Sequence, residues 1–318
     1  MSSSPRVVSL LPSATEMVAA VGMQSSLVGV SHECDYPEGV AGLPIMTRTT
    51  LRSLPSSADI DRDVRKLVTE VLAVYELEFD RLRDSKPDVI VTQDLCDVCA
   101  VSYDAVCAAA RELGNPNIEI VNLHPKVLQD IWNDIARVGV ALDRELNAEI
   151  VMADINKRVE DVRSRAAELE ERPTVLTIEW LDPVMIGGTW MPELVEIAGG
   201  QPLVTSPGDH APTLDLEQLR ALSPDVVLFK PCGFELERTE QERHVIEELL
   251  SAMDDWPAIR DERVFIADGN AYFNRPGPRI ADSLEILAAC IHPEHFEDFG
   301  EHYADGFRRF KSAQEPTL

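Results

Sequence analysis

Short apolar runs rich in β-branched residues alternate along this chain with longer segments in which apolar residues recur every three or four positions. The short runs lack a strict alternation of apolar and polar residues, which is typical of parallel strands buried on both faces. The longer segments have the spacing of amphipathic helices. This α/β order predicts strands at residues 7–11, 27–30, 89–92, 118–123, 175–178, 226–229 and 264–267.

Two stretches resemble each other closely enough to indicate a repeated plan. Residues 79–91 (FDRLRDSKPDVIV) and 216–228 (LEQLRALSPDVVL) both place a helical segment before Pro-Asp and an apolar strand after it. Proline cannot continue a helix, so each helix is expected to end before this dipeptide. A weaker echo pairs residues 16–22 with 193–199, and both end at a glycine typical of a helix C-terminus. We therefore predict two α/β lobes of similar construction.

A long polar segment separates the two predicted lobes. Its first part has apolar residues at helical spacing, and charged residues dominate from Asp154 to Glu171. A continuous helix of about 40 residues would span roughly 60 Å, with Gly139 marking a slight break. The predicted domains are an N-terminal α/β lobe at 1–125, a bridging helix at 126–172, and a C-terminal α/β lobe with a helical tail at 173–318.

The charge and the apolar runs limit the possible partners. The 56 acidic and 29 basic residues give a net charge of −27, which repels nucleic acid and anionic lipid. No run approaches the roughly 18 apolar residues of a membrane span, and the N-terminal apolar run stops at Pro12. We expect a small-molecule ligand, no nucleic-acid partner, no membrane insertion and a cytoplasmic location.

Four of the six cysteines follow predicted strands: Cys34, Cys96, Cys99 and Cys232. Ligands of open α/β sheets bind beyond the carboxyl ends of the strands, so these thiols are predicted to face one cleft. A cysteine cluster in a reducing compartment suits zinc or an iron–sulfur cluster. Cys96 and Cys99 also precede a helical segment, which favours the thiolate. A dithiol redox pair and inert thiols remain alternatives.

The opening phrase SLLPSATE at residues 9–16 resembles that of the class III periplasmic binding proteins, which include the cobalamin- and iron-siderophore-binding components of ABC importers. The resemblance extends to about Pro293. It is strongest to a leaderless, cytoplasmic branch labelled cobalamin-binding, through phrases at residues 32–37, 94–102, 179–183, 231–234 and 268–278. It implies two Rossmann-like α/β lobes, one long bridging α-helix and a ligand cleft between the lobes. The absence of an evident export signal makes an ABC importer a doubtful partner.

Several strand-end residues are candidate ligand contacts. A neutral imidazole at His32 is a common ligand for metals, including the cobalt of a corrinoid. Aromatic residues at strand ends suit a large planar ligand, or else fill the space between the lobes. Arg275 offers a planar fork to a carboxylate or phosphate, or else braces Glu179 or Asp94. The full candidate set is His32, Glu33, Arg48, Asp94, Glu179, Trp180, Trp190, Phe234, Asn270, Tyr272, Phe273 and Arg275.

The sequence contains no nucleophile elbow, P-loop or dinucleotide fingerprint, so a binding protein is favoured over an enzyme, although an enzymatic activity remains open. The leading hypothesis is a cytoplasmic bilobed protein that holds a corrinoid (cobalamin-like) or another bulky metal chelate between its lobes. The alternative is a cysteine-ligated metal or iron–sulfur protein with redox or sulfur chemistry. The sequence leaves the ligand and the oligomeric state open.

Overall fold

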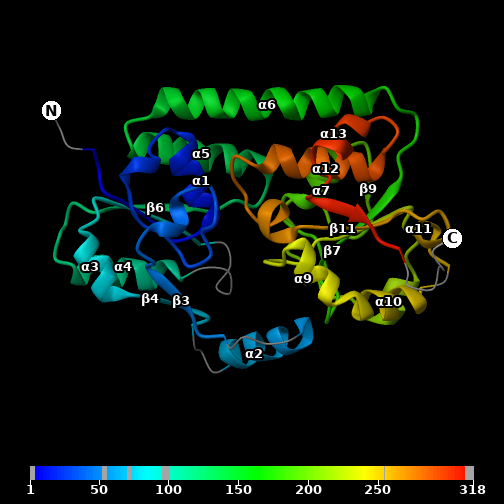
Figure 1. Cartoon of the computed structure of the whole chain (residues 1–318), viewed down its shortest axis with the longest axis horizontal. Coiled ribbons are helices and arrows are strands. Elements are labelled where there is room, and N and C mark those ends of the chain that lie inside the picture. Colours follow the sequence, from blue (N-terminus) through cyan, green and yellow to red (C-terminus); the bar gives the residue numbers. More distant parts are fainter. Residues whose placement is uncertain (1–3, 52–55, 70–72, 95–100, 254, 312–318) are drawn as a thin grey trace. The chain divides into compact units, whose positions relative to one another are not determined.

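The computed structural model describes residues 4–51, 56–69, 73–94, 101–253 and 255–311. The chain forms two compact units. Unit 1 comprises Met1–Pro55, Arg62–Ile155 and Pro276–Pro278, and unit 2 comprises Ser56–Asp61, Asn156–Arg275 and Arg279–Leu318. Helix α6 (Glu145–Ala167) runs without interruption from one unit into the other (Figure 1).

Unit 1 is built on a parallel sheet with the strand order β2-β1-β5-β6. Val7 of β1 pairs with Val89 of β5, which in turn pairs with Glu119 of β6, so the carboxyl ends of these strands meet at one edge. A separate antiparallel hairpin, β3-β4, flanks helix α2 in the sequence. The strands are β1 (Val7–Ser9), β2 (Leu27–Gly29), β3 (Thr47–Thr49), β4 (Tyr75–Leu77), β5 (Val89–Gln93) and β6 (Glu119–Leu123).

Helices pack on both faces of this sheet. Leu82 of α3 and Val106 of α4 pack with Val8 and Ile90 in one apolar cluster. Because neighbouring side chains of a strand point to opposite faces, Val7 lies on the other side, where α1 and α5 contact each other and the sheet. The helices are α1 (Pro12–Ala20), α2 (Ser57–Thr69), α3 (Phe79–Ser85), α4 (Tyr103–Glu112) and α5 (Leu128–Ala141), with 3-10 turns η1 (Gln24–Ser26) and η2 (Val40–Gly42).

Unit 2 contains a mixed sheet with the order β12-β11-β10-β7-β8, and β9 pairs with the start of β7. Strands β11, β10, β7 and β9 are parallel, whereas β12 and β8 are antiparallel to their neighbours. The strands are β7 (Thr174–Trp180), β8 (Met185–Ile186), β9 (Gln201–Pro202), β10 (Val226–Phe229), β11 (Val264–Ala267) and β12 (Phe307–Arg309).

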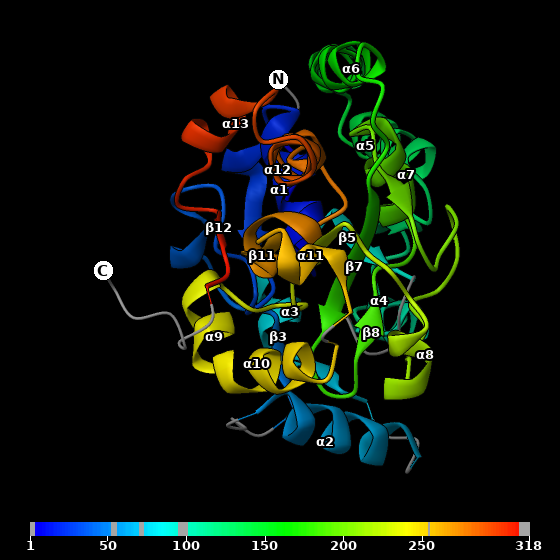
Figure 2. The ribbon, with the colours of Figure 1, turned by 90° about the vertical axis from the view of Figure 1, so that its right-hand side faces the viewer.

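The sheet of unit 2 is also covered on both faces, as Figure 2 shows. Ile246 of α10 packs with Val227 and Ile266 on one face. On the other face, Gly200 lies so close to Val175 that an added Cβ would stand 2.7 Å from it. The helices are α7 (Met191–Ile197), α8 (Leu216–Arg220), α9 (Leu236–Gln241), α10 (Arg243–Ser251), α11 (Pro257–Arg260), α12 (Ile280–Ile291) and α13 (Glu297–His302), with a π-type turn η3 (Gly269–Phe273).

The structure confirms the predicted fold class and all seven predicted strands, to within a few residues at their ends. The strands that the sequence did not predict, β3, β4, β8, β9 and β12, have only two or three residues each. Runs this short do not establish a period of two, so the hydrophobic pattern does not reveal them.

The predicted continuous bridging helix is two helices, α5 and α6, joined by a turn in which Asp143 has a φ of 53°. Gly139 lies inside α5, and an added Cβ there would stand 2.6 Å from the Cβ of Ala148. The glycine therefore allows α5 and α6 to approach closely, which is a different role from the expected break. Helix α6 alone has 23 residues, or about 34 Å at 1.5 Å per residue.

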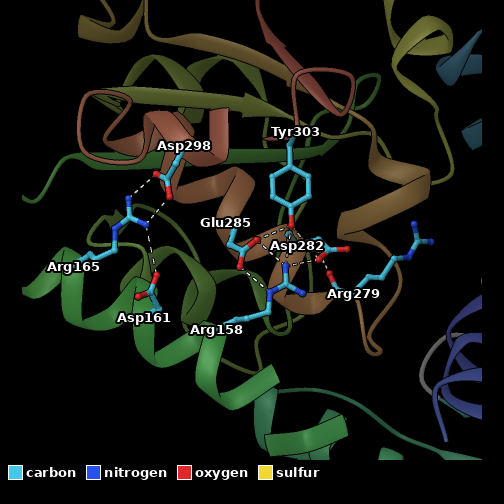
Figure 3. Close-up of polar contacts among 9 residues, drawn as sticks. Arg158, Asp161, Arg165, Arg279, Asp282, Glu285, Asp298 and Tyr303 are labelled. Carbon is cyan, nitrogen blue, oxygen red and sulfur yellow. Dashed lines mark hydrogen bonds and ion pairs between the residues drawn. The ribbon is translucent and has the colours of Figure 1, made fainter. Parts of the chain in front are cut away.

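Two arginines attach the second half of α6 to the rest of unit 2 (Figure 3). Arg158 lies 2.5 Å from Asp282 and 2.7 Å from Glu285, and it also donates to the hydroxyl of Tyr303 at 2.8 Å. About two turns further along α6, Arg165 pairs with Asp298 at 2.7 Å.

Among the described residues, no helix combines the length and the apolar character that a membrane span needs.

The two Pro-Asp dipeptides of the internal repeat make the same pair of contacts. Asp88 donates its backbone N–H to the carbonyl of Arg6 at 2.8 Å, and its carboxylate accepts the N–H of Arg6 at 2.8 Å. Asp225 donates to the carbonyl of Thr174 at 2.9 Å, and its carboxylate accepts the N–H of Thr174 at 2.8 Å. Each aspartate therefore fixes its own strand against the first strand of its unit.

One buried carboxyl group of unit 1 has a raised pKa. Asp134 of α5 is 1% exposed, accepts the backbone N–H of His124 at 3.0 Å and pairs with Arg137 at 2.7 Å. Burial raises the pKa of Asp134 to about 6, although the ion pair with Arg137 acts in the opposite direction. The folded protein therefore holds a proton that the unfolded chain releases between about pH 4 and 6.

We predict that Asp225→Ala lowers the free energy of unfolding by about 1–2 kcal/mol, because the backbone N–H and the hydroxyl of Thr174 both lose their acceptor. Asp88→Ala should cost less, since Asp88 is exposed and water replaces its single acceptor bond. Urea denaturation measures both, with Asp225→Asn as the control that keeps one acceptor oxygen. Equal stability of Asp225→Ala and the wild type would contradict this assignment.

We also predict that the wild type loses stability relative to Asp134→Asn as the pH rises from 4 to 6. A pKa raised by folding stabilises the folded state at low pH, and this contribution disappears as the pH rises through the folded pKa of about 6. Urea denaturation of both proteins at pH 4, 5, 6 and 7 measures the difference in unfolding free energy. A difference that grows in favour of the wild type with rising pH would refute the assignment.

Candidate functional site

His32 follows β2 in unit 1 and is held by a hydroxyl network. The Thr47 hydroxyl lies 2.7 Å from His32 Nδ1, accepts the His32 backbone N–H at 3.1 Å, and donates to the Ser31 hydroxyl at 3.0 Å. The imidazole is half-buried, and this burial lowers the pKa of His32 below its usual value, while the charge of Glu33 opposes the shift. The ring is therefore neutral at pH 7.

Glu33 has a partner within unit 1. Its carboxylate accepts a hydrogen bond from the hydroxyl of Tyr75 at 2.7 Å, and the tyrosine ring lies 5.4 Å from the ring of His32. Tyr75 belongs to β4, so the β3-β4 hairpin supplies partners to both candidate residues. The hairpin thereby fixes the loop after β2.

Arg48 and Asp94 lie apart from this network. Arg48 is on β3 and pairs across the hairpin with Glu76, and its side chain is 64% exposed. The acidic partner raises the pKa of Arg48 through a side-chain hydrogen bond. Asp94 is exposed directly after β5, where its backbone N–H donates to the carbonyl of Leu123 at 3.0 Å.

The cysteines give no support to the predicted metal cluster. Cys34 is 6% exposed, and its sulfur lies 3.1 Å from the hydroxyl of Thr15 in unit 1. Cys232 is an exposed thiol of unit 2. Cys96 and Cys99 lie outside the described residues. Within the part of the chain that the structure describes, no three His, Cys, Asp or Glu side chains come together to hold a metal ion. The described residues therefore do not support the predicted zinc or iron–sulfur site.

In unit 2, Glu179 and Lys230 form an ion pair at the carboxyl ends of neighbouring strands. Lys230 is 1% exposed, and its Nζ lies 3.0 Å from Glu179 Oε2. The pairing follows from the register, because Ile178 of β7 pairs with Phe229 of β10 and the next residue of each strand carries a charge. A buried ammonium needs such a partner, since desolvation otherwise favours its neutral form.

Trp180, Phe234 and Arg238 are stacked beside this ion pair. The ring of Trp180 lies 5.2 Å from that of Phe234, and the Arg238 guanidinium lies 4.3 Å from the centre of the Phe234 ring. Trp180 is half-buried, whereas Phe234 is 6% exposed. The stack therefore offers one aromatic side chain, Trp180, to a ligand and supports it with the others.

The turn after β11 completes this face of unit 2. Arg275 is 3% exposed and donates to Asn270 Oδ1 at 3.0 Å. Asp268 accepts the backbone N–H of Ala271, and burial raises the pKa of this carboxyl. An added Cβ at Gly269 would stand 2.1 Å from the carbonyl oxygen of Pro231, so the turns after β10 and β11 require glycine here. We name as the unit 2 strand-end surface Glu179, Trp180, Lys230, Phe234, Arg238 and Asn270.

The other aromatic candidates lie inside unit 2. Phe273 is completely buried, and Trp190 is 7% exposed and donates its indole N–H to the Phe273 carbonyl at 3.3 Å. Tyr272 packs edge-to-face on Tyr303 at 6.0 Å, and burial raises the pKa of Tyr272. Trp190 and Phe273 therefore belong to the core of unit 2, and the indole N–H of Trp190 is satisfied there by the backbone carbonyl of Phe273.

Sequence reasoning missed Lys230, Thr47 and Tyr75. A signal for Lys230 was present, since Glu179 and Lys230 each come directly after four apolar or β-branched residues of a predicted strand. Thr47 and Tyr75 lie on the short hairpin strands β3 and β4, for which the hydrophobic pattern gave no signal.

Comparisons with known proteins agree with this architecture. A family model described as periplasmic binding protein matches residues 7–271. The vitamin B12-binding protein of Vibrio cholerae is 22% identical over 295 residues, which are 90% of this chain and 88% of that protein. The uncharacterised ABC transporter substrate-binding lipoprotein YvrC of Bacillus subtilis is 20% identical over 299 residues, 92% of this chain and 82% of that protein.

Solved structures share the fold. A periplasmic haem-binding protein from Pseudomonas aeruginosa has a TM-score of 0.68 at 20% identity and covers 91% of this chain and 93% of its own. One of these relatives is an ABC transporter substrate-binding lipoprotein. The expectation that an importer is a doubtful partner therefore has no support. Because the family model spans both α/β units, the chain belongs to the periplasmic binding protein family.

Proposed function

We propose that this chain is a binding protein for a corrinoid or another bulky metal chelate. The observation that carries the proposal is the likeness to the vitamin B12-binding protein of Vibrio cholerae, which extends over 90% of this chain. A haem-binding protein of the same fold supports the wider class of macrocyclic metal chelates. That the ligand lies between the lobes stays a prediction, as does the cytoplasmic location.

Trp180 is the aromatic contact that we assign to such a ligand. It is the last residue of β7, is half-buried, and is backed by Phe234 at a ring separation of 5.2 Å. A flat apolar side chain held in this way stacks on a conjugated macrocycle with little loss of side-chain entropy. The buried Phe234, covered in turn by the half-buried Arg238, keeps its ring in place.

His32 is the nitrogen donor that we assign to the ligand metal. The Thr47 hydroxyl gives its single hydrogen to Ser31, so its lone pairs accept from the His32 backbone and from Nδ1. The imidazole proton then resides on Nδ1, and the lone pair is on Nε2. A neutral imidazole held in one tautomer by a hydrogen bond is a good metal ligand.

We propose an ABC importer as the partner of the loaded protein. The support is the likeness to an ABC transporter substrate-binding lipoprotein over 92% of this chain.

We predict that Thr47→Val releases the His32 ring from its fixed tautomer. In the wild type, nitrogen NMR should find the proton on Nδ1 at pH 7, whereas Thr47→Val should shift the population toward Nε2–H. Thr47→Ser keeps the hydroxyl and is the matched control. A wild-type spectrum with the proton on Nε2 would remove the basis for assigning Nε2 to a metal.

We predict that the purified chain binds at least one of cyanocobalamin, dicyanocobinamide, haemin or a ferric siderophore, and that Trp180→Ala weakens this binding about tenfold through loss of stacking. Ligand absorbance and tryptophan fluorescence measure the titrations. Phe299→Ala, which removes a half-buried aromatic ring from α13, is the control and should bind like the wild type. Failure of the folded wild type to bind all four compounds would refute the proposed function.

A further inference from the structure

We propose that the ligand carries amides or other uncharged polar groups at its rim, as a corrinoid does, rather than the paired carboxylates of a haem. This inference rests on the proposed function and narrows it to one ligand class. The relatives and neighbours of the chain include both vitamin B12-binding and haem-binding proteins, so their names do not separate the two classes. The charges at the strand ends of each unit do distinguish a corrinoid from a haem.

Two buried cations after the strands of unit 2 already have partners. Lys230 is 1% exposed and lies 3.0 Å from Glu179, which is itself 22% exposed. Arg275 is 3% exposed and donates to Asn270 at 3.0 Å. A ligand carboxylate would have to displace Glu179 to approach Lys230, and it would then leave that glutamate without its partner.

The third cation, Arg238, also has an acidic partner. Its Nη2 lies 2.6 Å from Glu242, whose side chain is 2% exposed and which also accepts the backbone N–H of Ser57 at 2.7 Å. The guanidinium of Arg238 covers the face of Phe234 at 4.3 Å. Removing Arg238 from this position would leave a buried carboxylate with one fewer partner, which is costly. Arg279, at the start of α12, lies 5.7 Å from the ring centre of Tyr272.

Apart from Arg238, whose side chain is 24% exposed, the groups that remain toward solvent on this face are acidic or neutral. Glu179 is half-buried, Glu235 is exposed after β10, and Asp268 is half-buried after β11. The negative charge of Glu235 contributes to raising the pKa of Asp268, which shows that the two carboxyl groups already repel each other. A further carboxylate from a ligand would add to this repulsion.

Unit 1 has a similar balance of charge, because its exposed cation Arg48 on β3 is paired with Glu76. The described residues that follow β1, β2 and β5 directly, 10–11, 30–39 and 94, include Glu33, Asp35, Glu38 and Asp94, and this part of the structure contains no lysine or arginine. Lys126 follows β6, which is the edge strand farthest from β2 in the sheet.

These charges favour one ligand class by attraction and reject the other by repulsion. Carboxylates and amide oxygens such as those of Glu179 and Asn270 accept hydrogen bonds from ligand amide N–H groups. A haem has two carboxylates, and each needs a cation or water as its partner. If they were buried beside fixed carboxylates of the protein, they would have neither. Specificity built in this way rests on a repulsive element as much as on contacts.

The test compares binding of the full chain to dicyanocobinamide, haemin and haemin dimethyl ester, which retains the macrocycle of haemin but lacks both carboxylates. We expect dicyanocobinamide to bind at least about tenfold more tightly than haemin, and the ester to bind more tightly than haemin. The comparison of haemin with its ester uses only the wild type, so it does not depend on a variant that folds.

A pair of variants tests the origin of the discrimination. Glu179→Gln removes a carboxylate and exposes the charge of Lys230 to the ligand, so it should improve haemin binding relative to cobinamide. Glu217→Gln removes the same charge from α8, which precedes β10, and should leave the ratio unchanged. Haemin binding that is tighter than that of its ester and of cobinamide would overturn the inference and leave the proposed function intact. Absence of binding to all three ligands would also overturn the inference, whereas the proposed function is refuted only if cyanocobalamin and the ferric siderophore fail to bind as well.

Discussion

The reciprocal hydrogen bonds of the two Pro-Asp dipeptides set the geometry on which the rest of this protein depends. In each unit the aspartate exchanges two hydrogen bonds with the residue that begins or precedes the first strand, Arg6 in unit 1 and Thr174 in unit 2. This contact aligns Val7 with Val89 and Val175 with Val226. With the amino ends in register, the carboxyl ends of the parallel strands fall at one edge, where the polar side chains collect.

The strand-end surfaces combine buried charge with few exposed cations. Lys230 is among the largest fully buried side chains of the chain, and a lysine in that position is stable only because the register of β7 and β10 brings Glu179 to its ammonium group. Glu242 plays a similar part for Arg238. In this way both of these cations are held by acidic partners of unit 2.

The two units support the two ligand contacts that we propose in different ways. In unit 1, a hairpin outside the main sheet holds His32 and Glu33 through Thr47 and Tyr75. In unit 2, an aromatic stack holds Trp180 through Phe234. A rigid nitrogen donor and a rigid aromatic face both lower the entropy that binding would otherwise cost, which is the physical benefit of supporting each contact with buried neighbours.

The sequence by itself determined the α/β class, the seven main strands and the repeated plan, because buried parallel strands leave continuous apolar runs and Pro-Asp ends a helix wherever it stands. It also placed His32 after a strand, whereas Glu179 and Trp180, expected after a strand, are the last two residues of β7. Only the tertiary structure decided that Trp190 and Phe273 are core residues, that Arg275 is buried against Asn270, and that residues 126–172 form two helices. These outcomes depend on which side chains meet across distant turns, and a one-dimensional pattern does not contain those distances.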